Sequence, residues 1–371
     1  MPKLPEPRGE ISEGIFEALA GPAGARPLPT ARAAGDPLED EDLQLALYCA
    51  YELHYRGFDD VDERWEWEPA LLAFRAALEA PFEEAVRAEA GPCEAPPPEL
   101  ADVALREIAD SDESPSLSMY IAREGTLDQA LEFLVHRSAY QLKEADPHSW
   151  AIPRLTGPPK AALVEVQADE YGGGRPDRMH STLFAKAMRA MGLDASYGAY
   201  LSSLPAPTLA TVNLMSLFGL HRRLRGAIAG HLALFEMTSS IPNRRYADGL
   251  RRLGAPPEAL DFFDEHVEAD AVHENIAAVD LAGGLMRHEP EVSADVILGA
   301  RALAALDARW AERVLEAWQS GESSLRPSRN RPRPRAGPAT SGEVARRASA
   351  RFPPGRRSPL GSGRRRSAAS G

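Results

Sequence analysis

Two histidines and an aspartate recur on one side of a predicted helix in the last third of the chain. His266, Asp270 and His273 are spaced i, i+4 and i+7, so on an α-helix they fall within an arc of roughly 60°. Phe262 and Phe263 project to the same side, which marks it as the face that packs against the core. A carboxylate buried beside two imidazoles is costly unless a cation neutralises the cluster, and this donor set suits iron, zinc or manganese. The pattern therefore predicts a metal site; a solvated helix face or a hydrogen-bonded core histidine is the alternative.

A second pair of candidate ligands flanks a run of glycines. Glu170 ends one predicted helix, Gly172–Gly174 interrupt it, and His180 lies in a helix predicted to resume near Pro176. On an uninterrupted helix the two side chains would point about 80° apart. A glycine bulge would bring them onto one site, and bulges within helices are often functional. A glycine hinge without any chemistry fits the same spacing.

Two further carboxylates lie on predicted helices rich in apolar residues. Glu236 is near the end of a long apolar helix expected over residues 207–240, where it is either a ligand or snorkels to water. Glu144 ends a helix that opens with a capping box at Thr126–Gln129. Because Glu144 shares a helix face with Phe133, Arg137 and Tyr140, we expect it to be partly buried.

The elements that must position these residues are helices. Apolar residues recur with helical periodicity and no segment alternates as a strand does, so the sequence predicts an all-α fold with six or more helices around a bundle core. Breaks are expected at the proline-rich segment 91–98 and at Pro242. The predicted domains are a flexible arm (1–38), an N-terminal helical subdomain (39–97), the metal-binding domain (98–321) and a disordered Arg/Pro/Ser-rich tail (322–371).

Charge and composition narrow the class of protein. Residues 321–371 hold 13 arginines and two acids, whereas the other 320 residues hold 29 basic and 53 acidic side chains, which argues against nucleic-acid binding by the folded body. Only Cys49 and Cys93 occur, so no disulfide framework and no thiolate metal site is expected. Neither a signal peptide nor a membrane-spanning run is evident, and we predict a cytoplasmic protein.

The order and spacing of the candidate ligands resemble those of a known family. The Glu-x-x-His repeat of ferritin-like bundles does not occur in suitable places. Glu170-x9-His180, a Glu236 thirty residues before His266, and the His-x3-Asp-x2-His helix are similar to the haem-oxygenase-like di-iron oxidases and oxygenases, the iron-containing redox enzyme family. The resemblance covers residues 126–318 and implies a haem-oxygenase-like bundle with an N-terminal helical extension. The metal ligands it implies are Glu170, His180, Glu236, His266, Asp270 and His273, with Glu144 matching a carboxylate that some members add.

The resemblance also implies an activity. It predicts a non-haem di-iron oxidoreductase with two irons per chain and O2 as co-substrate, acting on a small molecule by N-oxygenation or oxidative C–C cleavage of an amine, amino acid or fatty acid. An external electron donor and a homodimer are compatible with it, and no catalytic residue beyond the ligands is indicated. The alternative is a metal-stabilised or haem-binding protein of the same fold without di-iron catalysis. A haem oxygenase needs one axial histidine and no carboxylates, and a thiaminase-like hydrolase would need a cysteine in the bundle, where neither Cys49 nor Cys93 is expected.

Overall fold

The regular secondary structure of the chain is helical. The computed structural model describes residues 1–30, 35–111 and 114–328, except for the side chains of residues 268 and 270–272. Within these residues no strand occurs, which confirms the all-α prediction. The helices are α1 (Glu10–Leu19), α2 (Glu41–Glu52), α3 (Pro69–Ala90), α4 (Ala101–Asp110), α5 (Leu117–Arg123), α6 (Leu127–Gln141), α7 (Asp146–Ser149), α8 (Gly157–Glu170), α9 (His180–Ala190), α10 (Ala206–Leu220), α11 (Arg225–Arg252), α12 (Asp261–Asn275), a π-helical continuation (Ile276–Gly283), α13 (Gly284–His288) and α14 (Ser293–Gln319).

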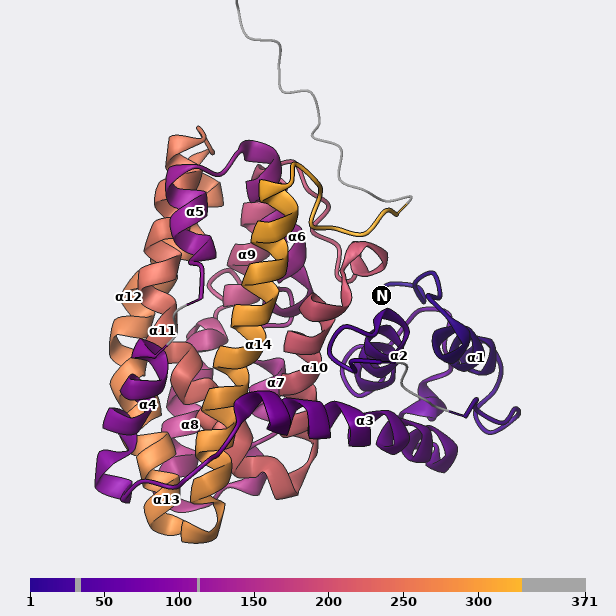
Figure 1. Cartoon of the computed structure of the whole chain (residues 1–371), viewed down its shortest axis with the longest axis horizontal. Helices are drawn as coiled ribbons and strands as arrows, with labels where there is room; N and C mark the ends of the chain where they lie inside the picture. Colours follow the sequence, from indigo (N-terminus) through magenta and orange to yellow (C-terminus); the bar gives the residue numbers. More distant parts are fainter. Residues whose placement is uncertain (31–34, 112–113, 329–371) are drawn as a thin grey trace, which may run out of the picture. The chain divides into compact units, whose positions relative to one another are not determined.

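Helix α11 is the centre of the bundle, with α12 and α14 packed along it (Figure 1). Two glycines allow the backbones of α11 and α14 to touch. A Cβ atom at Gly230 would overlap the backbone carbonyl of Val296, and one at Gly299 would overlap that of Ala227. Since only glycine lacks a Cβ, these two positions fix how closely the two longest helices approach.

The long apolar segment around Glu236 folds differently from the prediction. The expected single helix over residues 207–240 is two helices, because α10 stops at Leu220, where Arg154 donates hydrogen bonds to the carbonyl oxygens of Gly219 and Leu220 (2.8 Å for the latter). The expected break at Pro242 is also wrong, since α11 continues through it to Arg252. Packing along α12 and α14 outweighs the single backbone hydrogen bond that a proline removes.

The N-terminal segment is more ordered than a flexible arm. Residues 10–19 form α1, and its Ile15 and Leu19 are fully buried. The carboxylate of Asp42, on α2, accepts hydrogen bonds of 2.8 Å from the backbone N–H groups of Ile11 and Ser12, which caps the start of α1. The expectation of a loosely attached arm is thereby corrected for this helix, while the domain boundaries themselves stay predictions.

The start of the predicted tail packs on the body. Leu325 is buried, and the backbone N–H and hydroxyl of Ser324 donate hydrogen bonds to the Glu132 carboxylate at 2.9 and 2.7 Å. The backbone N–H of Arg326 donates to the carbonyl oxygen of Ser203. The prediction that the chain is disordered from residue 322 onward is therefore wrong for residues 322–328. The rest of the predicted tail lies outside the described residues.

These contacts predict where the chain can be shortened. Truncation after Gly321 is expected to lower the free energy of unfolding by about 3 kcal/mol, because it removes a buried leucine and hydrogen bonds to a carboxylate. Truncation after Ser328 keeps those contacts and should unfold like the full chain. Urea unfolding of the two truncated chains would measure the difference, and equal stabilities would contradict the packing of residues 322–328.

The structure can be compared with what the sequence indicated about the cysteines and about membrane-spanning segments. Cys49 is buried in α2 and Cys93 is partly exposed after α3, and both are free thiols. No helix in the described residues is long and apolar enough to cross a membrane. The cytoplasmic location stays a prediction.

Candidate metal centre

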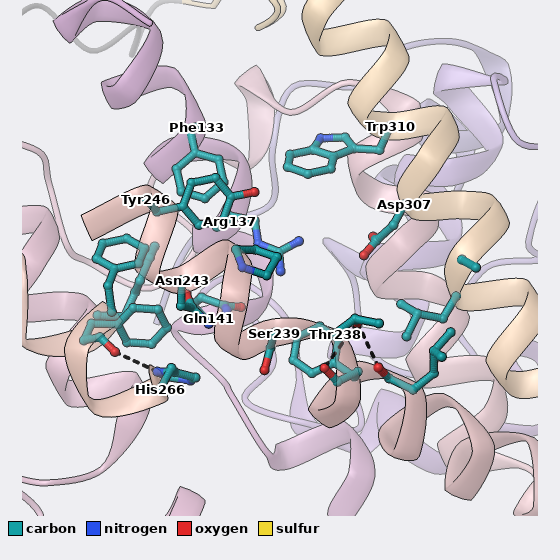
Figure 2. Close-up of a pocket in the computed structure, with 18 of the residues that line it drawn as sticks. Phe133, Arg137, Gln141, Thr238, Ser239, Asn243, Tyr246, His266, Asp307 and Trp310 are labelled. Atoms are coloured by element: carbon teal, nitrogen blue, oxygen red, sulfur yellow. Dashed lines mark hydrogen bonds between the residues drawn. The ribbon is translucent and has the colours of Figure 1, made fainter. Parts of the chain in front are cut away.

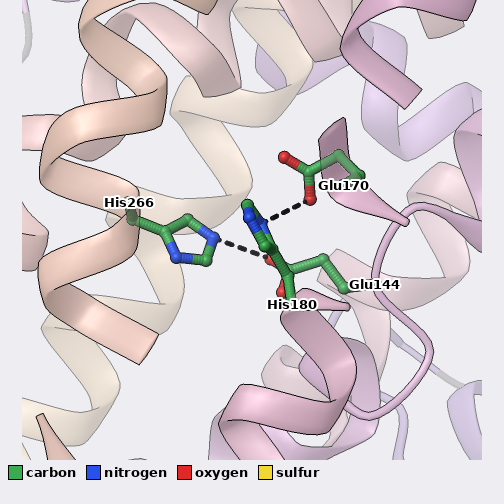
Figure 3. Close-up of side chains that lie close together, drawn as sticks. All are labelled: Glu144, Glu170, His180 and His266. Carbon is green, nitrogen blue, oxygen red and sulfur yellow. Dashed lines mark ion pairs between the residues drawn. The ribbon is translucent and has the colours of Figure 1, made fainter. Parts of the chain in front are cut away.

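Helix α12 turns its two histidines into the core. The exposed fractions of His266 and His273 are 4% and 1%. The Nδ1–H of His266 donates a 2.7 Å hydrogen bond to the carbonyl oxygen of Phe262, one turn earlier, so the ring lone pair is on Nε2, which lies 3.5 Å from Oε1 of Glu144 (Figure 3). The third residue predicted on this face, Asp270, has a side chain that lies outside the described part of the chain.

The glycine run brings Glu170 and His180 together, as predicted. Glu170 is the last residue of α8 and His180 the first of α9, and its Nδ1 lies 2.9 Å from Oε2 of Glu170. The chain reverses between them because Gly172, Gly173 and Gly174 have φ angles of 69°, 60° and 78°, a left-handed conformation that favours glycine. Helix α9 therefore begins later than the predicted start near Pro176.

Gly172 is expected to be the sensitive position in this turn. A Cβ atom there would lie 2.7 Å from the backbone of Arg178 and Met179, whereas one at Gly173 would meet nothing within 4 Å. Both substitutions to alanine carry the strain of a positive φ, about 1 kcal/mol. Gly172→Ala must in addition displace the chain next to His180, so we expect it alone to weaken metal binding clearly. Metal content of the two purified variants tests this, and equal loss in both would show that strain alone matters.

Two more carboxylates complete the set. Glu144 lies in the turn just after α6, which ends at Gln141 rather than at Glu144 as predicted, and Ala145 follows with a φ of 74°. Glu144 is buried, and its Oε2 has no hydrogen-bond partner among the described residues. Glu236, on α11, is also buried, with Oε2 3.4 Å from Nδ1 of His273.

These six buried residues form two overlapping clusters. The ligand-type atoms of the first cluster lie within 4.8 Å of one another, and so do those of the second. The first consists of Glu144, Glu170, His180 and His266, and the second of Glu170, Glu236 and His273. Glu170 belongs to both, so the geometry offers two cation positions that share one carboxylate.

The electrostatics of the clusters fit a cation. Burial raises the pKa of both Glu144 and Glu236. Burial lowers the pKa of His273, but the hydrogen bond and charge of Glu236, together with Asp169 and Glu170, outweigh it and raise that pKa to about 9. Burial thus disfavours the charged forms of these carboxylates, and Glu236 favours the charged form of His273; a divalent cation would supply a compensating positive charge. With the unpartnered Oε2 of Glu144, this nitrogen and oxygen donor set suits iron.

Asp169 is a residue that the sequence analysis missed. The Nε2–H of His273 donates a 3.0 Å hydrogen bond to Oδ2 of Asp169, which leaves Nδ1 facing Glu236. A carboxylate bound to the second nitrogen of a histidine ligand fixes its tautomer and orientation. One signal for Asp169 was present in the sequence, since it directly precedes Glu170. Its partner His273, however, lies about a hundred residues further along the chain.

A large cavity adjoins the clusters and was not foreseen. It has a volume of about 210 Å³ and is lined mainly by α6, α11, α12 and α14, with one residue each from α4 and α9. Figure 2 shows Phe133, Arg137, Tyr246, Trp310 and His266 in its wall. A second cavity of about 10 Å³, room for roughly one water, lies beside it and is lined by metal-cluster residues and by three residues of the large cavity. The shared residues are Phe235, Ser239 and His266.

Comparison with known proteins gives one family match and one relative over part of the chain. Residues 131–308 match the family described as iron-containing redox enzymes, which confirms the resemblance seen in the sequence. One relative is a nitrosourea synthase from Streptomyces achromogenes subsp. streptozoticus, 29% identical over 138 residues. The matched stretch is 37% of this chain and 29% of the length of that protein.

Proposed function

We propose that the chain is a non-haem di-iron oxidase or oxygenase that uses O2 to oxidise a small molecule. The observation that carries this proposal is the place of Glu170 in both buried clusters. A carboxylate between two metal positions is the usual way for a helical bundle to hold two irons. The family match supports iron, and the cavity beside His266 supports a small-molecule substrate.

Each residue has a role in this proposal. Glu144, His180 and His266 would hold one iron, Glu236 and His273 the other, and Glu170 would bridge them. When bound, the irons supply O2 binding and electron transfer to it. The Phe262 carbonyl and the Asp169 carboxylate hold the rings of His266 and His273 in the orientation that ligation requires. The aromatic wall of the large cavity keeps bulk water away from the reacting end of the substrate.

N-oxygenation is the favoured reaction among those predicted. The relative is named for making a nitrosourea, a product with a nitrogen–oxygen bond. Oxidative C–C cleavage of an amino or fatty acid is the other possibility from the same centre. Because each turnover consumes electrons, an external electron donor belongs to the proposal.

A metal-stabilised or haem-binding protein without di-iron catalysis is the competing function. One axial histidine suffices for haem, whereas this core buries three glutamates beside three histidines. A cysteine-dependent hydrolase is equally disfavoured, since neither Cys49 nor Cys93 lines the metal clusters or the large cavity. The donor set therefore favours iron without haem.

Anaerobic titration with Fe(II), followed by Mössbauer spectroscopy, tests the proposal. We expect saturation at two irons per chain and no Soret band. Saturation at one metal would contradict the shared role of Glu170, and a Soret band would favour the haem alternative.

Asp270 enters the proposal as a further iron ligand, on the spacing of His266, Asp270 and His273 alone. We expect Asp270→Ala to weaken iron binding by more than the roughly 10–100-fold typical of residues that only orient a ligand. Glu268→Ala is the matched control, because its position projects roughly 160° from that of Asp270 on a helical wheel of the sequence, and the change should alter stability by no more than about 0.5 kcal/mol. The iron content of the two purified variants tests whether Asp270 is a ligand. Equal iron content would remove Asp270 from the ligand set.

A further inference from the structure

The small cavity beside the metal clusters is lined by three buried side chains that each have an unpartnered polar atom. Its volume is about 10 Å³, and Glu144, His148 and Gln167 are among the residues that line it. Oε2 of Glu144, Nδ1 of His148 and Oε1 of Gln167 have no hydrogen-bond partner among the described residues. Buried polar groups are nearly always hydrogen-bonded, and a buried water typically makes about three hydrogen bonds. In number and in volume, these three atoms match a single water molecule.

The side-chain amide of Gln167 is held in one orientation. Its Nε2 donates 2.9 Å hydrogen bonds to the carbonyl oxygen of Ala145 and to Oγ of Ser149. Turning the amide over would place its oxygen against the Ala145 carbonyl oxygen, and two acceptors repel each other. Both N–H groups are therefore committed, and the acceptor Oε1 is the atom that Gln167 offers to the small cavity.

A chain of hydroxyl groups behind Gln167 fixes the same direction. The Tyr171 hydroxyl donates a 2.8 Å hydrogen bond to Oδ1 of Asp146, so the 2.9 Å hydrogen bond between Tyr171 and Ser149 is donated by Ser149. Because Ser149 has one proton to donate, its Oγ accepts from Gln167. Asp146 in turn pairs at 3.3 Å with Arg56, and both of these side chains are partly exposed. Every donor in the chain points away from the small cavity, which leaves an acceptor at its inner end.

His148 supplies a donor to the same cavity. Burial lowers the pKa of His148 to about 3 and holds that of His231 well below its ordinary value, so both rings are neutral and each carries one N–H. Nε2 of His148 lies 3.1 Å from Nδ1 of His231. A water that donates its two protons to Gln167 and Glu144 must accept from the Nδ1–H of His148. Nε2 of His148 then accepts from the Nδ1–H of His231, and one arrangement of protons satisfies the whole group.

We infer that the small cavity binds one water molecule, which donates hydrogen bonds to Gln167 and Glu144 and accepts one from the Nδ1–H of His148. The inference also rests on the proposed function, because it makes Gln167 and His148 the positioning residues for an oxygen ligand of the irons. When Glu144 holds iron, these two residues remain to bind that ligand. A donor and an acceptor in one small cavity favour a ligand that both accepts and donates, as water does, over an anion that can only accept.

The metal-free full chain tests the water site without relying on iron. We expect its crystal structure to show one water within hydrogen-bond distance of Oε1 of Gln167 and Nδ1 of His148, and nitrogen-15 NMR of labelled histidine to show His148 and His231 protonated at Nδ1. Gln167→Met should lose the water and the single tautomer of His148, whereas Gln319→Met, at an exposed glutamine on α14, should change neither. Absence of the water from the unsubstituted chain, or an Nε2–H tautomer of His148, would overturn the inference.

Binding of azide to the cobalt(II)-loaded full chain tests the link to the metals. Cobalt(II) accepts nitrogen and oxygen ligands as iron(II) does, and its visible absorption reports a change of ligand. Azide only accepts hydrogen bonds, so the Gln167 oxygen opposes it, and we expect Gln167→Met to bind azide about tenfold more tightly than the unsubstituted chain or Gln319→Met. Equal azide affinities would overturn the positioning role of Gln167 and His148. Failure to bind iron or cobalt would instead overturn the proposed function, while the water site is measured without metal.

Discussion

Glu170→Ala is expected to abolish iron binding at both positions, whereas Glu236→Ala is expected to remove only one iron. Glu170 is the carboxylate common to the two clusters, so its loss leaves each with one anionic ligand fewer among the described residues. Glu236 belongs only to the cluster with His273, and the four residues of the other cluster remain in place. Iron per chain after anaerobic loading, measured with helix content as a check of folding, distinguishes the two variants.

Glu165→Ala is the matched control for this comparison. Glu165 is exposed on the same helix, α8, and its removal should leave two irons per chain. If Glu170→Ala still binds one iron as tightly as the unsubstituted chain, the carboxylate does not bridge, and the two clusters would have to be independent sites. If Glu236→Ala loses both irons, binding at the two positions is cooperative, and the assignment of ligands to separate irons would be wrong.

Local signals made much of the fold predictable. The capping box at Thr126 is present, with its hydroxyl accepting from the Gln129 backbone and the Gln129 side chain accepting from the Thr126 backbone. The glycine run positions Glu170 against His180, because a positive φ is a local property that glycine alone tolerates well. Helical periodicity is likewise a local property, because it depends on residues three or four positions apart.

Features that depend on distant partners could not be predicted. The end of α10 is set by Arg154, and the start of α1 by the carboxylate of Asp42. The large cavity is lined by residues of six helices, so no single stretch of sequence reveals it. Asp169 and His273 are likewise hydrogen-bonded across more than a hundred residues of sequence.

Glu52 forms a buried ion pair with Lys143. In the structure Glu52 and Lys143 are each 1% exposed, and Nζ of Lys143 donates a 2.8 Å hydrogen bond to Oε2 of Glu52. The Tyr197 hydroxyl donates to the same carboxylate, and the Lys143 ammonium lies 4.2 Å from the ring centroid of Tyr55. The pair ties α2 to the turn that carries Glu144.

Glu52→Gln is therefore expected to lower the free energy of unfolding by about 3–5 kcal/mol, because it leaves the Lys143 ammonium buried without its counter-charge. Adding Lys143→Met should restore most of that loss, since an uncharged, well-packed replacement of both partners removes the unpaired charge. Glu316→Gln, at an exposed ion pair with Arg313, should change stability by no more than about 0.5 kcal/mol. Urea unfolding of the four chains gives these values.

The same variants separate stability from metal binding. Lys143 is the residue directly before Glu144, so Glu52→Gln should also lower iron occupancy at the position that Glu144 serves, while the cluster of Glu170, Glu236 and His273 contains no residue of this turn. We expect the double variant to recover stability more fully than iron occupancy, because Lys143→Met restores packing without the hydrogen bond that orients the turn. Recovery of both to the same extent would show that the ion pair acts on the fold alone, and an unchanged stability of Glu52→Gln would mean that water reaches the Lys143 ammonium.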